Sequence, residues 1–169
     1  GTPGDTGKSM NGLIHQLQAG VEAETINSIN IGALSADTIF DQVELFVDGI
    51  AEVYQHVKMD VCLSPRWYKA YFRDKRSNGF YDYKSSRDIN AEIDFTPQQV
   101  KALPSISGTD VIFATPKNNL LHLTKKSKNK TNIKIEEYRR NVSFYCDWWE
   151  GIGFGMDAAV WTNLQKQEG

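Results

Sequence analysis

The sequence has no excess of charge of either sign, no long apolar run and very little cysteine. Its 19 basic and 21 acidic residues leave a formal net charge of −2, which does not favour binding of the whole chain to nucleic acid or to an anionic membrane. No apolar segment approaches the roughly 20 residues that span a bilayer. Residues 1–12 lack the apolar core of a signal peptide and have the composition of a flexible linker or terminus. We therefore expect no membrane partner.

Cysteine is too scarce to organise the fold. The two cysteines, Cys62 and Cys146, each lie in an apolar, strand-like run. Two cysteines in a chain of 169 residues do not make a disulfide scaffold. We expect both to be buried free thiols that pack as small hydrophobic side chains.

Clusters of residues that bind metals or catalyse reactions are also missing from the sequence. The three histidines, His15, His56 and His122, are far apart and show none of the paired spacings of zinc ligands. The neighbouring carboxylates Glu136 and Glu137 would point to opposite faces of a strand, so they do not make an acid–base pair. We therefore predict no enzyme activity, no metal and no cofactor, and we assign no catalytic residue.

Two glycine-rich segments come close to nucleotide-binding motifs without matching them. The N-terminal GTPGDTGKS has five residues between its first glycine and the Gly-Lys pair, where a P-loop has four. The segment 151–155, GIGFG, lacks the last glycine position of a dinucleotide fingerprint, and no helix is expected after it. Alternate glycines in a strand are better explained by the close packing of a neighbouring backbone or ring.

The chain does have enough apolar side chain for one packed domain, because 40% of its residues are apolar and 11% are aromatic. The clearest element is an amphipathic helix over 36–57, with apolar residues at steps of three and four and Ser35 as its N-cap. A short buried strand is expected at 59–63. A helix then begins at Ser64-Pro65 and breaks in the turn 73–79.

Strands dominate the second half of the predicted fold. The expected strands are 100–103, 111–114, 132–139, 141–149 and 152–161. A short helix is expected at 117–123, because Thr115-Pro116 repeats the pattern of a cap followed by proline. Together the elements predict an α+β fold, in which one long helix and short helices pack on a mixed, mostly antiparallel sheet.

Two short basic segments are the candidate contact sites of the chain. One lies in the turn 73–79 and the other follows residue 124. Their cations are Arg73, Lys75, Arg76, Lys125, Lys126, Lys128 and Lys130. The lysine loop contains no aromatic residue, although sites for single-stranded nucleic acid usually stack bases on aromatic rings. We interpret these cations as contacts to an acidic neighbouring subunit, with a solvated loop or a nucleic-acid-binding module as alternatives.

The order of the segments resembles the major capsid proteins of tailed bacteriophages, which have the Hong Kong 97-type fold. The segments that carry the resemblance are NGLIHQL, DTIFDQVELFVDGIAEVY, VCLS, PRWYKAYFRDKRSNG, LPSISGTDVIFATPKNNLLHLT and IEEYRRNVSFYCDWWEGIGFGMDAAVW. They cover roughly residues 12–163. The chain departs from the family at its front, because the N-terminal arm, the extended loop and the long spine helix of such proteins are absent from it.

The resemblance implies the C-terminal half of a capsid protein of a phage or prophage. Residues 1–12 are then a linker or terminus, 13–131 an axial-type domain, 132–163 a peripheral-type β segment and 164–169 a tail. The terminal β-strands are expected to form an extended lobe. The implied function is a structural subunit of the virion, assembled in the bacterial cytoplasm, which acts by packing without catalysis or cofactor. Its implied partners are copies of itself, in hexamers and pentamers when full length, and other virion proteins. Contact with nucleic acid is only indirect.

The alternative is a small-molecule-binding or enzymatic α+β domain with an aromatic-lined cleft. It is supported by the aromatic residues Trp67, Tyr68, Tyr71, Trp148, Trp149 and Trp161. Aromatic side chains line ligand clefts, but they also build domain cores and subunit interfaces. The sequence alone leaves this alternative open.

Overall fold

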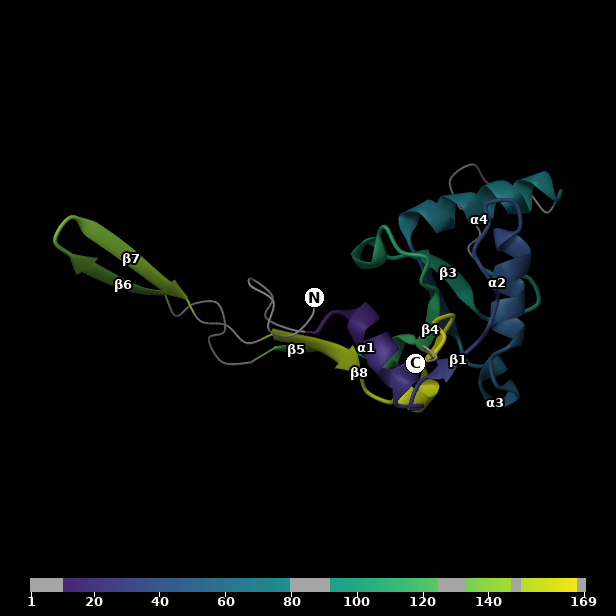
Figure 1. The fold of residues 1–169 in the computed structure, drawn as a ribbon, viewed down its shortest axis with the longest axis horizontal. Helices are drawn as coiled ribbons and strands as arrows, with labels where there is room; N and C mark the ends of the chain where they lie inside the picture. Colours follow the sequence, from purple (N-terminus) through teal and green to yellow (C-terminus); the bar gives the residue numbers. More distant parts are fainter. Residues whose placement is uncertain (1–10, 80–91, 125–132, 147–149, 167–169) are drawn as a thin grey trace.

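A mixed sheet of five strands lies at the centre of the fold (Figure 1), in the order β1–β9–β4–β2–β3. The computed structural model describes residues 11–79, 92–124, 133–146 and 150–166. The strands of this sheet are β1 (Asn27–Ser28), β2 (Met59–Leu63), β3 (Gln99–Ala102), β4 (Phe113–Pro116) and β9 (Trp161–Thr162). β2 is parallel to β3 and antiparallel to β4, while β9 is antiparallel to β4 and parallel to β1. The predicted α+β class with a mixed sheet is confirmed.

Helices cover both faces of this sheet. They are α1 (Leu13–Glu22), α2 (Ile39–Asp48), α3 (Glu52–Gln55) and α4 (Pro65–Ser77), with the short 3-10 turns η1 (Pro104–Ile106), η2 (Lys117–Asn119) and η3 (Asp157–Ala159). Val61 and Ala114 pack in one core cluster with side chains of α2 and α4. Cys62 and Phe113 pack in a second cluster with side chains of α1. Because successive strand residues point to opposite faces, β2 and β4 are buried on both sides along most of their length.

Two further sheets of two antiparallel strands extend the C-terminal half. The first pairs β5 (Leu120–Thr124) with β8 (Glu150–Phe154), and the second is the hairpin of β6 (Ile133–Tyr138) and β7 (Asn141–Cys146). The first sheet is attached to the domain by a contact between the Phe113 and Phe154 rings, whose centres are 6.1 Å apart. Figure 1 shows the β6–β7 hairpin at the far end of the molecule, away from the five-stranded sheet.

The single long helix predicted over 36–57 is wrong. The structure has α2 and the short α3 instead, separated by residues 49–51. Gly49 is the C-cap of α2, and a Cβ atom at this position would lie 2.8 Å from Cγ2 of Ile29. A glycine weakens a helix, and the close approach of Ile29 requires one here. The buried stripe ends at Ile50, and Val57 is 39% exposed.

Two predictions near the C-terminus are also wrong, because pairing between strands that are distant in sequence overrides the local pattern. The expected helix 117–123 is only the turn η2, since Leu120 and the residues after it pair with β8. The expected strand 152–161 is divided into β8, η3 and β9. The Asn119 side chain holds the bend between them, because its Oδ1 accepts from Met156 N at 2.7 Å and its Nδ2 donates to Met156 O at 2.9 Å.

Cys62 is a buried free thiol, as predicted. Burial raises its pKa from the ordinary value of 9.0 to about 12, and the negative charge of Asp60 adds to the effect. Cys146 lies in β7, but its side chain is outside the described residues. The thiol of Cys62 is therefore neutral at physiological pH and packs as a hydrophobic group.

We expect the stability that Cys62 contributes to decrease between pH 9 and about pH 12. The unfolded chain loses the thiol proton near the ordinary pKa, whereas the folded chain keeps it up to the raised pKa. The full contribution is therefore present below pH 9 and is lost above it, by at most about 1.4 kcal/mol per pH unit. Urea unfolding of the wild type and of Cys62→Ala across this range measures the difference. Parallel curves for the two proteins would contradict the assignment.

Candidate subunit-contact surfaces

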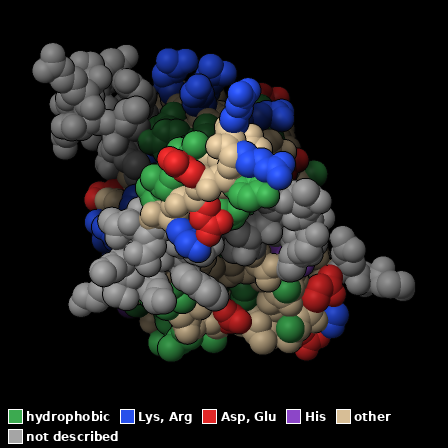
Figure 2. Space-filling model, turned by 90° about the vertical axis from the view of Figure 1, so that its left-hand side faces the viewer, with side chains coloured by type: hydrophobic (Ala, Val, Ile, Leu, Met, Phe, Trp, Pro, Cys, Tyr) green, Lys and Arg blue, Asp and Glu red, His purple; other side chains and the backbone are tan. Residues whose placement is uncertain are grey.

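Helix α4 carries a stripe of cations along its exposed face. Arg66, Lys69, Arg73 and Arg76 are exposed and follow one another at steps of three and four, which places them on one side of the helix. Figure 2 shows Lys and Arg side chains gathered at the top of the molecule, where α4 lies. Within the described part of the chain, no carboxylate forms an ion pair with these four side chains. We call them the α4 cation stripe.

The stripe contains two of the cations that the sequence singled out. Arg73 and Arg76 were predicted as subunit contacts, and both are exposed on α4. Arg66 and Lys69 were missed, although their spacing from Arg73 already indicated a shared helix face. The lysines of the other predicted segment, Lys125, Lys126, Lys128 and Lys130, lie outside the described residues, and their role as contacts stays a prediction.

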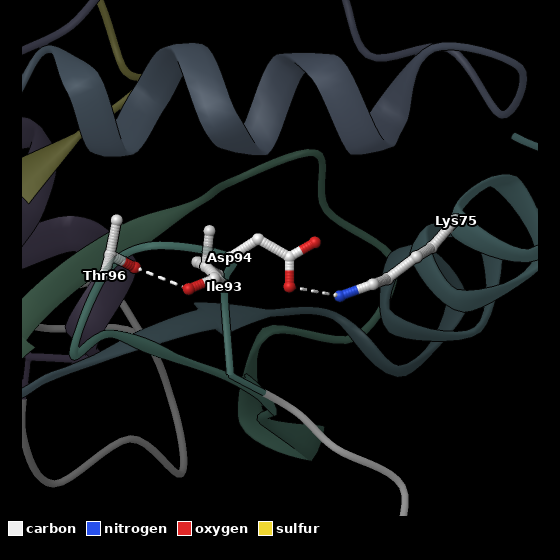
Figure 3. Close-up of polar contacts among 4 residues, drawn as sticks. All are labelled: Lys75, Ile93, Asp94 and Thr96. Carbon is white, nitrogen blue, oxygen red and sulfur yellow. Dashed lines mark hydrogen bonds and ion pairs between the residues drawn. The ribbon is translucent and has the colours of Figure 1, made fainter. Parts of the chain in front are cut away.

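Lys75 was also predicted to be a subunit contact, but its side chain is buried within the domain. The residue is only 9% exposed, and its Nζ lies 3.1 Å from Oδ1 of Asp94 (Figure 3). Its ammonium group also lies 5.8 Å from the centre of the Phe40 ring. The reason is that α4 continues to Ser77 instead of breaking at residue 73. A continuous helix places Lys75 on the same buried side as Tyr71, four residues earlier.

Helix α2 presents an acidic outer face next to this ion pair. Asp41 and Asp48 are exposed and Glu44 is half-buried between them. Burial raises the pKa of Glu44, and the carboxylates of Asp41, Asp94 and Asp48 raise it further, while the nearby Lys75 lowers it. Glu44 therefore lies within the electrostatic influence of these three carboxylates. Leu45, which is 54% exposed, adds an apolar side chain to the same face.

The β6–β7 hairpin has one apolar face that is open to solvent. Ile133 pairs with Cys146, Ile135 with Phe144 and Glu137 with Val142, so these pairs share one face. The exposed fractions are 58% for Ile133, 57% for Ile135, 52% for Val142 and 69% for Phe144. We call Ile133, Ile135, Val142 and Phe144 the apolar hairpin face.

The opposite face of the hairpin is more polar than the apolar hairpin face. It carries Lys134, Glu136 and Ser143, together with Tyr138 and Tyr145. Lys134 Nζ and Glu136 Oε1 are 2.6 Å apart on this face. The hairpin is therefore amphipathic, like a strand pair that has one side against a protein surface and one side in water.

Three of the four described aromatic residues that supported a ligand cleft lie in the core. Trp67, Tyr71 and Trp161 are 4%, 0% and 3% exposed and belong to the cluster between the sheet and α2–α4. The Trp67 indole N–H donates to Oδ1 of Asp110 at 2.7 Å. Tyr68 is partly buried against the same cluster, while Trp148 and Trp149 lie outside the described residues. These core residues are explained by packing.

One close pair of titratable groups lies on the β5–β8 sheet. His122 Nε2 lies 2.7 Å from Oε1 of Glu150 across the β5–β8 sheet, where both side chains are partly exposed. In residues 11–79, 92–124, 133–146 and 150–166, no group of three or more His, Cys, Asp or Glu side chains is arranged to hold a metal ion. None of the helices in the described ranges is long and apolar enough to cross a membrane.

The surfaces described above are the α4 cation stripe, the acidic face of α2 and the apolar hairpin face. Comparison with protein-family models, with curated proteins and with solved structures gives no match to this chain. Any functional conclusion therefore depends on the residues themselves. Two of the three surfaces carry opposite charges, and the third is apolar.

Proposed function

We propose that this chain is a structural subunit that assembles with copies of itself by surface packing, without catalysis. The observation that carries the proposal is the apolar hairpin face, where four large apolar side chains are each more than half exposed. A hairpin of two strands is at best marginally stable alone in water. Contiguous apolar patches on a protein surface mark protein contacts.

The more specific form of the proposal is a subunit, or part of a subunit, of a tailed-phage capsid shell. The order of the sequence segments supports this form, through its resemblance to the Hong Kong 97-type capsid proteins. In this function the partners are further copies, in hexamers and pentamers when the protein is full length, and other virion proteins. The protein then belongs to a virion that is assembled in the bacterial cytoplasm.

Sedimentation velocity over a concentration series tests the proposal. From about 1 µM to about 300 µM, a range that spans weak to moderate association, we expect the sedimentation coefficient to rise toward a defined oligomer. A closed oligomer with point-group symmetry would give a plateau rather than unlimited growth. A single monomeric species over the whole range would contradict the proposal.

A further inference from the structure

A turn near the acidic face of α2 displays a phenylalanine in a conformation that costs free energy. Phe95 has a backbone φ of 62° and a side chain that is 108% exposed. For a bulky residue a positive φ is a true outlier. An exposed ring adds nothing to the core. Neither the positive φ of Phe95 nor its exposed side chain therefore stabilises the isolated domain. Strained residues of this kind are concentrated at functional sites.

The turn that displays Phe95 is held on both sides (Figure 3). Asp94 is bound by the buried Lys75, whose Nζ lies 3.1 Å from its Oδ1. The hydroxyl of Thr96 donates to Ile93 O at 2.9 Å. Ile93 is itself 2% exposed, and its N–H donates to the carbonyl of the buried Gln98 at 3.0 Å. These contacts fix the backbone that carries Phe95, which reduces the conformational entropy lost when its side chain meets a partner.

The surroundings of Phe95 define the chemistry of its partner. Asp94 is on the turn itself, and its ion-pair partner Lys75 lies 5.8 Å from the ring of Phe40 in α2, the helix that carries Asp41, Glu44 and Asp48. The cation that faces this group from the neighbouring helix, Lys75, is already in contact with Asp94. An exposed aromatic ring among carboxylates fits a partner surface that is both basic and aromatic.

Helix α4 of the same chain has this combination of properties. The α4 cation stripe has no acidic partner among the described residues. Tyr68 and Phe72 lie beside it, partly buried, with ring centres 4.9 Å apart. Acidic and basic surfaces of one molecule attract between copies, and a contact of two different surfaces repeats head to tail until a ring closes.

We propose that Phe95 and the carboxylates around it, on one copy of the chain, dock on the α4 cation stripe of a second copy. The ring contacts Tyr68 and Phe72 of that copy, and Asp41, Glu44 and Asp48 face its cations. This inference rests on the proposed self-assembly and names one of the contacts through which it occurs. The contact is separate from the apolar hairpin face, so the two can be tested independently.

The first test is Phe95→Gly, measured by sedimentation and by thermal unfolding. Glycine adopts a positive φ without strain, so the melting temperature should stay constant or rise by about 3 °C. Self-association should weaken by roughly thirtyfold, as expected for an aromatic hot spot. A role confined to the fold predicts the reverse: a lower melting temperature with unchanged association. Unchanged association would overturn the proposal.

The second test is an exchange of charges between the two surfaces. We expect Lys69→Glu/Arg73→Glu to weaken self-association at least tenfold, and Asp41→Lys/Asp48→Lys to do the same. An equimolar mixture of these two variants should associate more strongly than either alone, because each supplies the surface complementary to the other. If the mixture associates no better than its components, while the wild type still assembles, this contact is wrong and the proposed function stands. If the wild type does not associate at all, both are wrong.

Discussion

Replacing Ile135 and Phe144 by threonine should raise the dissociation constant of self-association roughly a thousandfold. The two residues lie opposite each other on the apolar hairpin face and are 57% and 69% exposed. If a neighbouring copy covers these side chains, each replacement removes about 2 kcal/mol of burial free energy from the association. Two such losses give about three powers of ten in the dissociation constant. Sedimentation velocity measures the constant directly.

The same double replacement should leave the melting temperature nearly unchanged. Both side chains are more than half exposed, so little intramolecular burial is lost, and threonine retains a high strand propensity. The matched control is Tyr138→Thr/Tyr145→Thr, which removes two exposed aromatic rings from the other face of the hairpin. We expect this control to associate as the wild type does. Equal weakening by both variants would mean that the apolar face has no special role.

Asp74→Ala should lower the free energy of unfolding by about 3 kcal/mol, because it removes a buried charged acceptor. Asp74 is 5% exposed, and its Oδ2 accepts from the N–H of Phe40 at 2.9 Å at the start of α2. Its Oδ1 accepts from Nδ2 of Asn78 at 3.2 Å. The N-cap residue of α2, Thr38, makes no side-chain capping bond. Asp74 therefore caps α2 from the neighbouring helix. Its negative charge also interacts favourably with the positive end of the α2 helix dipole.

Urea unfolding of Asp74→Ala followed by circular dichroism measures this loss. Asp74→Asn is the control, since an amide oxygen still accepts from Phe40 but carries no charge. We expect it to lose about 1 kcal/mol, the difference between a charged and a neutral acceptor. A loss below about 0.5 kcal/mol for the alanine variant, the range of ordinary surface substitutions, would show that Asp74 does not hold α2 and α4 together.

The parts of the fold that depend on local sequence were predictable. The strand 59–63 matches β2, because four of its five residues are apolar and the proline that follows starts a helix. The strands of the hairpin were found from their alternation, and the structure adds that Arg139 has a φ of 56° in the turn between them. The two central residues of this turn, Arg139 and Arg140, are neither glycine nor asparagine, so its tight geometry had no clear sequence signal.

The parts that depend on contacts between distant segments were not predictable. Ser35 was expected to cap a long helix, whereas Asp74 caps α2 from another element. The turn signal at residues 78–79 predicts an exposed Lys75, whereas α4 continues to Ser77 and buries this side chain. The displayed ring of Phe95 depends on Lys75 and on the buried Ile93 and Gln98, and a single sequence does not show that these residues meet.

Hydrogen exchange of the hairpin amides at low and high protein concentration tests the central claim most directly. The claim is that further copies of the chain cover the apolar hairpin face. It predicts that amides in 133–138 and 141–146 exchange rapidly in the dilute monomer and become protected as assembly proceeds, because association stabilises a hairpin that is marginal alone. Rapid exchange of these amides in a sample that sedimentation shows to be assembled would contradict the claim.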